Sequence, residues 1–92
     1  MDNKLYMVIT SWCPYCRRSL KWMDEMKKAN EKYRDLDIEV IDEEVDPQAA
    51  SRYDYRLVPN FHLKGEKIFE GAATEKDIQE VMEKTWQAQK QK

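Results

Sequence analysis

Apolar residues along the chain change between two spacings, which predict strands and helices in turn. The continuous apolar run Leu5–Ile9 has the length of a strand and suits the buried middle of a sheet. From Pro14 to about Tyr33, apolar residues recur three or four positions apart while Arg and Lys occupy the other side. This stretch is predicted to be an amphipathic helix, and the segment Ile38-Glu39-Val40-Ile41 is predicted to be a second strand.

Turn and capping residues place the next elements. Asp46 followed by Pro47 is typical of a helix start, with Asp as the N-cap and Pro at the first helical position, and we expect this helix to run to about Tyr55. The segments Phe61–Leu63 and Lys67–Phe69 predict a hairpin, because the glycine between them gives the backbone the freedom that a tight turn needs.

A last helix is predicted from Thr74 onward. Thr74 with Asp77 three residues later resembles a capping box, and the residues expected to be buried are Ile78, Val81, Met82, Thr85 and Trp86. The polar end, residues 87–92, is expected to fray. The order is a βαβ unit followed by a ββα unit, which predicts an α/β fold with one four-stranded mixed sheet and helices on both faces.

Composition limits the class of protein. A chain of 92 residues has room for one domain, spanning residues 1–92. The formal net charge of −2 gives no reason to expect a nucleic-acid partner, and the longest apolar run is far shorter than the ~18 residues of a membrane helix. The N-terminal residues lack the pattern of a signal peptide. We therefore expect a soluble, monomeric, cytoplasmic protein.

The two cysteines carry the candidate chemistry. In a reducing cytoplasm, a lone Cys-x-x-Cys is more often catalytic or metal-binding than a permanent disulfide. Side chains three residues apart on a helix lie about 5 to 6 Å apart, within the Cα separation that a disulfide tolerates. Cys13 begins a helix with Pro14 at its first position, where free N–H groups and the helix dipole stabilise a thiolate. The expected hydrogen-bond donors to its sulfur are the Tyr15 and Cys16 backbone N–H groups and the Cys16 thiol.

These positions predict distinct roles for the two thiols. Cys13 is expected to attack a substrate disulfide, and Cys16, one turn further on the apolar face, to resolve the mixed disulfide. Half of a metal site and a pair of inert structural cysteines are the alternatives. A structural zinc needs four ligands, whereas the chain offers two thiols and one histidine, His62, which we expect to be an ordinary sheet residue.

The motif resembles a known family. Cys13-Pro14-Tyr15-Cys16 after the first strand is similar to the active site of dithiol glutaredoxins, and Leu57-Val58-Pro59-Asn60 is similar to that family's Thr-Val-Pro segment. The resemblance implies a thioredoxin-like fold and no bound cofactor. It also implies that Pro59 is cis and lies beside the nucleophile, that the backbone of Val58 pairs with a bound peptide or glutathione, and that glutathione is the reductant or co-substrate.

Several residues depart from the glutaredoxin pattern. Thr10 stands where the family usually has a Lys, and Met7 stands where thioredoxins place a buried Asp. Trp12 is a thioredoxin feature, and it either forms a substrate platform or covers the end of the sheet. The expected substrate-binding segment, which resembles thioredoxins more than glutaredoxins, is Gly71, Ala72, Ala73 and Thr74.

Tyr15 is expected to contact substrate, as is Pro14, whereas the acidic run 42–46 is expected to be a solvated loop.

Three functions are consistent with these residues. The first is a glutaredoxin-like reductase of protein disulfides or glutathione mixed disulfides. The second is a thioredoxin-like electron carrier that a flavin disulfide reductase reduces. The third is a non-enzymatic protein that binds a metal or an iron–sulfur cluster through the two thiols.

Overall fold

The computed structural model describes residues 3–90. Its elements follow in the order β1 (Leu5–Ile9), α1 (Pro14–Ala29), α2 (Glu31–Arg34), β2 (Ile38–Asp42), α3 (Pro47–Ala50), β3 (Asn60–Leu63), β4 (Glu66–Glu70) and α4 (Glu75–Lys90). No helix within this part of the chain is long and apolar enough to cross a membrane.

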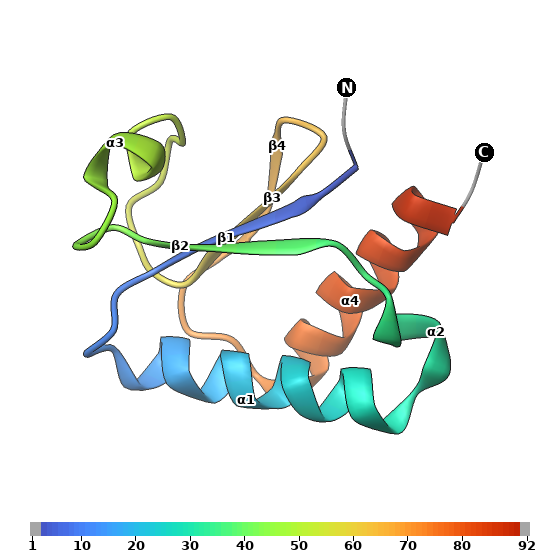
Figure 1. The fold of residues 1–92 in the computed structure, drawn as a ribbon. Coiled ribbons are helices and arrows are strands. Elements are labelled where there is room, and N and C mark those ends of the chain that lie inside the picture. Colours follow the sequence, from blue (N-terminus) through green and yellow to red (C-terminus); the bar gives the residue numbers. More distant parts are fainter. Residues whose placement is uncertain (1–2, 91–92) are drawn as a thin grey trace.

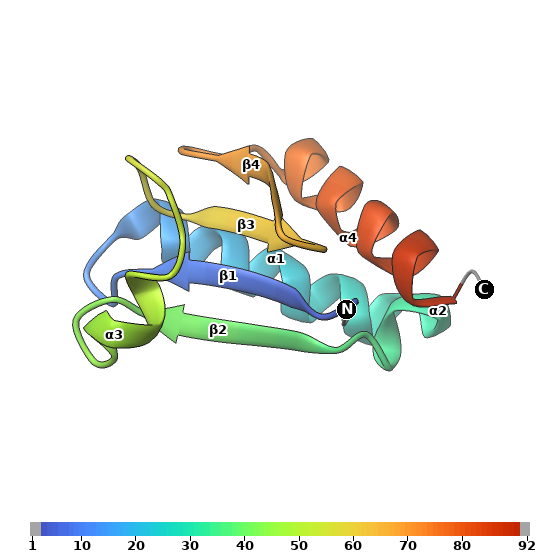
Figure 2. The ribbon, with the colours of Figure 1, turned by 90° about the horizontal axis from the view of Figure 1, so that it is seen from above.

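The four strands form one mixed sheet in the order β2-β1-β3-β4. β1 pairs with β2 in parallel, and β3 pairs antiparallel with both β1 and β4. α1 and α4 lie together on one side of this sheet, whereas α3 lies on the other side near the end of β2 (Figures 1 and 2). The predicted α/β architecture, with helices on both faces, is confirmed.

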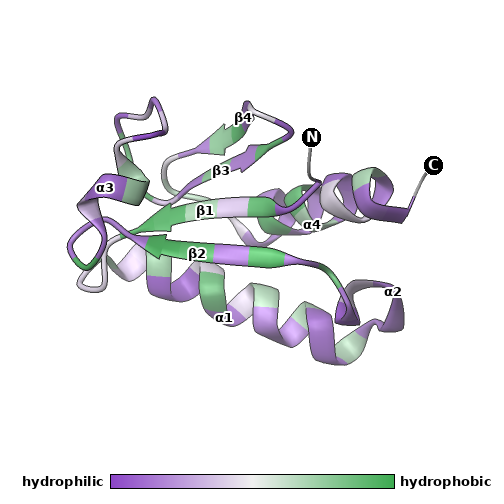
Figure 3. Cartoon of the chain, turned by 45° about the horizontal axis from the view of Figure 1, so that its top comes forward, coloured by the Kyte–Doolittle hydropathy of each residue, from purple (hydrophilic) through white to green (hydrophobic). Residues whose placement is uncertain are grey.

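Side chains of β1 point alternately to the two faces of the sheet and contribute to a core on each face. Leu5, Met7 and Ile9 belong to the larger cluster with residues of α1 and α4, whereas Val8 belongs to a smaller cluster with Ile41 and Ala50. Successive side chains of a strand point to opposite faces, so β1 contributes to both clusters. Figure 3 shows β1 largely in apolar green and α1 with alternating polar and apolar patches, as expected for a strand covered on both sides and a helix covered on one.

The long helix predicted from Pro14 to Tyr33 is in fact two helices. α1 ends at Ala29, and Asn30 adopts an extended backbone, with φ −130° and ψ 116°. Its side chain accepts a hydrogen bond of 3.2 Å from the Lys32 N–H and so caps α2. A short polar side chain that bonds the backbone in this way competes with the continuing helix.

The ends of the other helices also differ from the prediction. α3 stops at Ala50, because Tyr53 and Tyr55 pack against the α3-side cluster of the sheet instead of continuing the helix. α4 remains helical through Lys90, where we expected fraying from residue 87. The Gln89 amide donates 2.9 Å hydrogen bonds to the carbonyls of Asn3 and Asp37 and fixes this end. The part of the predicted frayed end at residues 91–92 lies outside the described residues.

Candidate functional site

Cys13 and the helix that follows it begin where β1 ends. Cys13 is the N-cap of α1, with φ −80° and ψ 119°, and Pro14 is at the first helical position, as predicted. The Cys13 N–H donates to the Thr10 carbonyl at 3.4 Å, and its own carbonyl accepts from the Arg17 N–H at 3.1 Å. These bonds close the turn between β1 and α1 and hold the first cysteine at the N-terminal end of the helix.

Cys16 lies one turn into α1 and is fully buried. Burial raises the pKa of its thiol to about 12, its hydrogen bond and charge interaction with Cys13 act in the same direction, and a hydrogen bond with the Thr10 backbone opposes them. Both cysteines are free thiols. Cys16 is therefore a protonated thiol held next to the Cys13 sulfur.

The predicted donors to the Cys13 sulfur are present only in part. The Cys13 side chain accepts no capping hydrogen bond, so the Tyr15 and Cys16 N–H groups do not serve as predicted. The sulfur is instead hydrogen bonded to the Cys16 side chain, the third predicted donor. The Cys13 sulfur is thus hydrogen bonded to the Cys16 thiol and not to the backbone N–H groups of α1.

An exposed rim of large side chains surrounds the cysteines. Trp12 is 66% exposed and Tyr15 is 46% exposed, and Pro14 between them is exposed too. The Arg18 guanidinium lies 5.7 Å from the centre of the Tyr15 ring, a cation–π distance. Trp12 lies on this exposed rim, where it is accessible to a substrate, and its role stays a prediction.

The segment before β3 contains the predicted cis proline. The Val58–Pro59 peptide bond is cis, and Pro59 is buried. Val58 packs against the same core cluster that contains Cys13, Cys16 and Ala73. The cysteines, Val58 and Ala73 thus all contribute to one core cluster, and the placement of Pro59 beside Cys13 stays a prediction.

Gly71 joins the cis-proline segment to the end of β4. Its N–H donates to the Pro59 carbonyl at 2.8 Å, and its φ of +101° is a backbone conformation that favours glycine. A Cβ added here would lie 3.3 Å from Leu57 Cδ1. These contacts give Gly71 a structural reason to be glycine, and a role in substrate binding stays a prediction.

The rest of the 71–74 segment divides between the surface, the core and the start of α4. Ala72 is exposed and Ala73 is buried. The Thr74 N–H donates to Asp77 Oδ2 at 2.9 Å, and the Asp77 N–H donates to Thr74 Oγ1 at 3.2 Å. This reciprocal pair is the predicted capping box, so the Thr74 hydroxyl already serves the helix.

Glu70 is a site residue that the sequence analysis did not identify. One of its carboxylate oxygens accepts hydrogen bonds from the backbone N–H groups of Arg56 and Leu57, the second at 3.0 Å, and Lys67 Nζ lies 2.8 Å from the other oxygen. The Lys67 and backbone hydrogen bonds lower the pKa of Glu70 to about 2. A side chain from β4 therefore anchors the backbone that leads to Val58 and Pro59.

Glu43 is a second residue that we did not predict, since the acidic run 42–46 was expected to be a solvated loop. Its N–H donates to the Ile9 carbonyl at 2.9 Å, and its carboxylate accepts from the Tyr55 hydroxyl at 2.6 Å. Its negative charge also contributes to the raised pKa of Cys16. The signal was available, because parallel strands bring their carboxyl ends to one edge of a sheet, and Cys13 and Glu43 both follow such ends.

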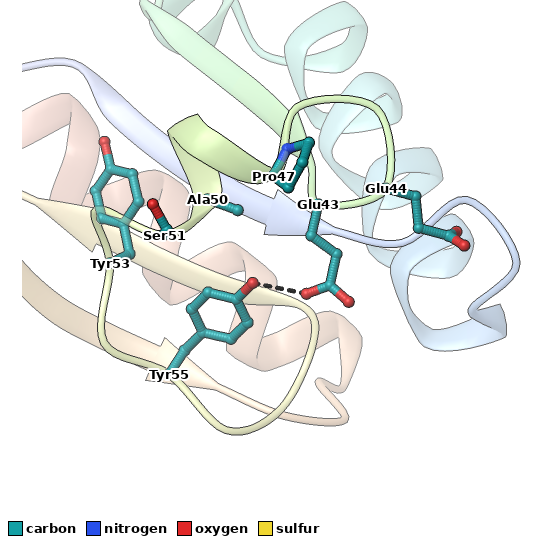
Figure 4. A pocket seen from close by; sticks show the side chains of 7 residues that line it. All are labelled: Glu43, Glu44, Pro47, Ala50, Ser51, Tyr53 and Tyr55. Carbon is teal, nitrogen blue, oxygen red and sulfur yellow. Dashed lines mark hydrogen bonds between the residues drawn. The ribbon is translucent and has the colours of Figure 1, made fainter.

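A cavity of about 500 Å³ opens on the α3 side of this sheet edge. Figure 4 shows Glu43 and Tyr55 joined by their hydrogen bond, with Tyr53 and Ser51 nearby. Within residues 3–90, no group of three or more His, Cys, Asp and Glu side chains is arranged to hold a metal ion.

Comparison with known proteins agrees with this geometry. A sequence model of the thioredoxin domain matches residues 4–83. A probable thioredoxin of Methanothermobacter thermautotrophicus is 34% identical over 71 residues, which are 76% of this chain and 80% of the relative. The thioredoxin of Methanocaldococcus jannaschii is 28% identical over 81 residues, which are 88% of this chain and 93% of the relative.

Solved structures show the same fold. The oxidised thioredoxin of Plasmodium falciparum superposes with a TM-score of 0.68 at 18% identity, covering 88% of this chain and 78% of that one. The Fasciola hepatica thioredoxin superposes with a TM-score of 0.67 at 20% identity, covering 89% of this chain and 79% of that one.

Proposed function

Because the chain belongs to the thioredoxin domain family, whose members include thiol-disulfide oxidoreductases, we propose that it reduces disulfide bonds of partner proteins through Cys13 and Cys16. The observation that carries the proposal is the pairing of a cysteine at a helix N-terminus with a fully buried cysteine whose thiol has a pKa of about 12. Cys13 keeps 6% of its surface exposed and Cys16 keeps none, so the proposal makes Cys13 the sulfur that attacks first.

The reaction balances in two exchanges. The Cys13 thiolate attacks one sulfur of the partner disulfide, that S–S bond breaks, and the other partner sulfur leaves as a thiolate that takes up a proton. Cys16 then loses its proton and attacks the Cys13 sulfur of the mixed disulfide. The second partner sulfur leaves as a thiolate, and the protein is left with a Cys13–Cys16 disulfide, so that two electrons have passed to the partner.

The exposed rim and the cis-proline segment supply the partner-binding surface in this proposal. Trp12, Pro14 and Tyr15 offer apolar and aromatic area next to Cys13. The backbone of Val58, next to the cis Pro59, is the site where an extended partner segment would pair. Gly71 and Ala72, which adjoin that segment through the Gly71–Pro59 hydrogen bond, complete the surface.

We propose a flavin disulfide reductase as the electron donor. Thr10, which replaces the Lys usual in glutaredoxins, is only 1% exposed, so neither a cation nor an accessible polar group is offered to a glutathione carboxylate there. Thr74 uses its hydroxyl to cap α4. Glutathione as the reductant, which the Cys-Pro-Tyr-Cys motif favours, is the second candidate.

A side-by-side turnover assay tests both parts of the proposal. Reduction of insulin disulfides is followed with NADPH and a thioredoxin reductase in one arm, and with NADPH, glutathione and glutathione reductase in the other. We expect NADPH consumption in the first arm and little in the second, with Cys13→Ser inactive in both. Turnover in the glutathione arm alone would establish the glutaredoxin-like alternative.

Inactivity of the wild-type protein in both arms, and with dithiothreitol as the reductant, would remove the proposed function. The metal-binding alternative is then tested by the metal and acid-labile sulfide content of protein purified without oxygen. Two thiols from each of two chains would have to supply its ligands, and a Cys13→Ser variant would lose them.

A further inference from the structure

A buried amide links the sheet to the segment before the cis proline. Asn60 is the first residue of β3 and is fully buried. Its Nδ2 donates a 3.0 Å hydrogen bond to the Leu57 carbonyl, and its Oδ1 lies 2.8 Å from Nε2 of His62. One side chain thus touches both the strand and the segment Leu57-Val58-Pro59.

The chemistry of these groups fixes the direction of each hydrogen bond. A backbone carbonyl can only accept, so the Asn60 NH₂ group must face Leu57 and the amide oxygen must face His62. The amide oxygen can only accept in turn, so His62 must carry a hydrogen on Nε2. The network therefore runs from His62 as donor, through Asn60, to the Leu57 carbonyl.

His62 is held firmly enough to act as the fixed end of this network. It is only 5% exposed, and its ring centre lies 4.6 Å from that of Tyr53, which itself lies 5.7 Å from the ring of Tyr6. Burial and the nearby charge of Lys67 lower the pKa of His62, so the ring is neutral at neutral pH. The sheet and the aromatic rings on its α3 side leave the histidine little freedom to turn.

The peptide group whose carbonyl accepts the last hydrogen bond of this network is the group that we expect to bind the partner. The Leu57 carbonyl and the Val58 N–H belong to one planar peptide group, so holding the oxygen also aims the N–H. Leu57 itself is 59% exposed and gives this plane little packing, whereas its own N–H is bound by Glu70. The Asn60 side chain is thus the buried support on the carbonyl side.

We propose that His62 and Asn60 are positioning residues for partner binding, because together they orient the Leu57–Val58 peptide plane whose N–H pairs with an extended segment of the partner. This inference rests on the proposed function, in which the Val58 backbone binds the partner. Neither residue takes part in the thiol chemistry at Cys13 and Cys16.

The test separates binding of an extended partner from the chemistry of the cysteines. Reduced protein is mixed with excess insulin, or with the small disulfide bis(2-hydroxyethyl) disulfide, and its single-turnover oxidation is followed by tryptophan fluorescence. Saturation with insulin gives an apparent Kd and a maximal rate. The small disulfide has no peptide segment to pair with Val58, so it reports on the cysteines alone.

Matched variants test the aromatic ring and the hydrogen-bond donor of His62 separately. His62→Phe keeps an aromatic ring against Tyr53 and removes the hydrogen-bond donor, whereas His62→Gln restores an Nε2–H₂ donor without the ring. Loss of one net hydrogen bond predicts a roughly fivefold higher Kd for insulin in His62→Phe. The maximal rate and the small-disulfide rate should stay unchanged, and His62→Gln should recover most of the insulin affinity.

A second variant keeps the test decisive if His62→Phe folds poorly. Asn60→Asp is nearly isosteric but turns the donor facing Leu57 into an acceptor, so it should weaken insulin binding at least as much. Because both residues act through one network, the double variant His62→Phe/Asn60→Asp should bind no worse than Asn60→Asp alone. Thr85→Ala, which removes the buried hydrogen bond of 2.8 Å to the Val81 carbonyl in α4, controls for general destabilisation.

Each outcome has a definite meaning. An unchanged insulin Kd in both His62→Phe and Asn60→Asp would overturn this inference and leave the proposed function intact. Equal loss with insulin and the small disulfide, failure of His62→Gln to recover affinity, or a Kd rise of the same size in Thr85→Ala would show a merely structural role and also overturn it. A wild-type protein that reduces the small disulfide but not insulin would instead remove the proposed function.

Discussion

The hydroxyl of Tyr55 donates a 2.6 Å hydrogen bond to Oε1 of Glu43, and this pair lies at the same edge of the sheet as the cysteines. Burial and the bond to Glu43 raise the pKa of Tyr55 to about 12, so the phenol stays a donor at neutral pH. Glu43 remains half-buried, and its charge adds to the effect of burial and of Cys13 on the Cys16 thiol. A tyrosine far from the cysteines in sequence thus holds a carboxylate that influences one of them.

Removing the charge of Glu43 is expected to lower the pKa of Cys16. In a Cys13→Ser background, where Cys16 is the only thiol, we expect Glu43→Gln to shift the pH titration of Cys16 alkylation by iodoacetamide, followed by mass spectrometry, to lower pH. The shift should be small compared with the rise caused by burial, which is the main cause. Glu44→Gln removes an exposed carboxylate next in sequence and should leave the titration of Cys16 unchanged. An equal shift in Glu44→Gln would mean that Glu43 acts only through the net charge of the protein.

The two cysteines are expected to fail in different ways when replaced. Cys13→Ser should abolish reduction of every disulfide, because it removes the attacking sulfur. Cys16→Ser should still form the mixed disulfide with a partner but not release it, and mass spectrometry of the trapped adduct checks this. If Cys16→Ser also keeps turnover of a glutathione mixed disulfide with glutathione, the reductant is glutathione; loss of adduct formation in Cys16→Ser would contradict the assigned order.

Protonation of Glu70 is expected to destabilise the folded protein in acid. Its pKa is about 2 in the folded protein against an ordinary value of 4.5, so the unfolded chain binds the proton more readily. The stabilisation is therefore complete above about pH 4.5 and is lost as the pH falls towards 2. Urea unfolding between pH 2 and pH 6 should show a shallower loss of stability in Glu70→Gln than in wild type, whereas Glu80→Gln at an exposed position should follow the wild-type profile.

Short-range signals were enough to predict most elements of the fold. The apolar run of β1, the strand-like segment of β2, the Pro14 start of α1 and the Thr74–Asp77 capping box all depend on residues a few positions apart, and all are present. The predicted hairpin is present too. Lys64 and Gly65 both have positive φ in the two-residue turn between β3 and β4, as such turns require.

The break at Asn30 is a local feature that the sequence analysis missed, whereas the other missed features depend on contacts between distant segments. α4 is held at its end by Gln89, which bonds Asn3 and Asp37 across more than fifty positions of sequence. At the site, the cysteine pair was predictable because both residues lie in one helical turn. Glu70, by contrast, reaches back to Arg56 and Leu57, and its role follows only from the pairing of β3 with β4.

Gly71 is expected to be the glycine that tolerates substitution least. Gly71→Ala places a Cβ at a φ of +101°, and that Cβ would lie 3.3 Å from Leu57 Cδ1, whereas Gly65→Ala meets only the backbone cost, since nothing lies within 4 Å of its Cβ position. Residues held in such backbone conformations cost on the order of 1 to 3 kcal/mol each. Thermal and urea unfolding should therefore show a larger loss in Gly71→Ala than in Gly65→Ala. Leu57→Ala combined with Gly71→Ala should recover part of that difference by opening space at Leu57, and an equal loss at the two glycines would mean that the contact with Leu57 is absent in solution.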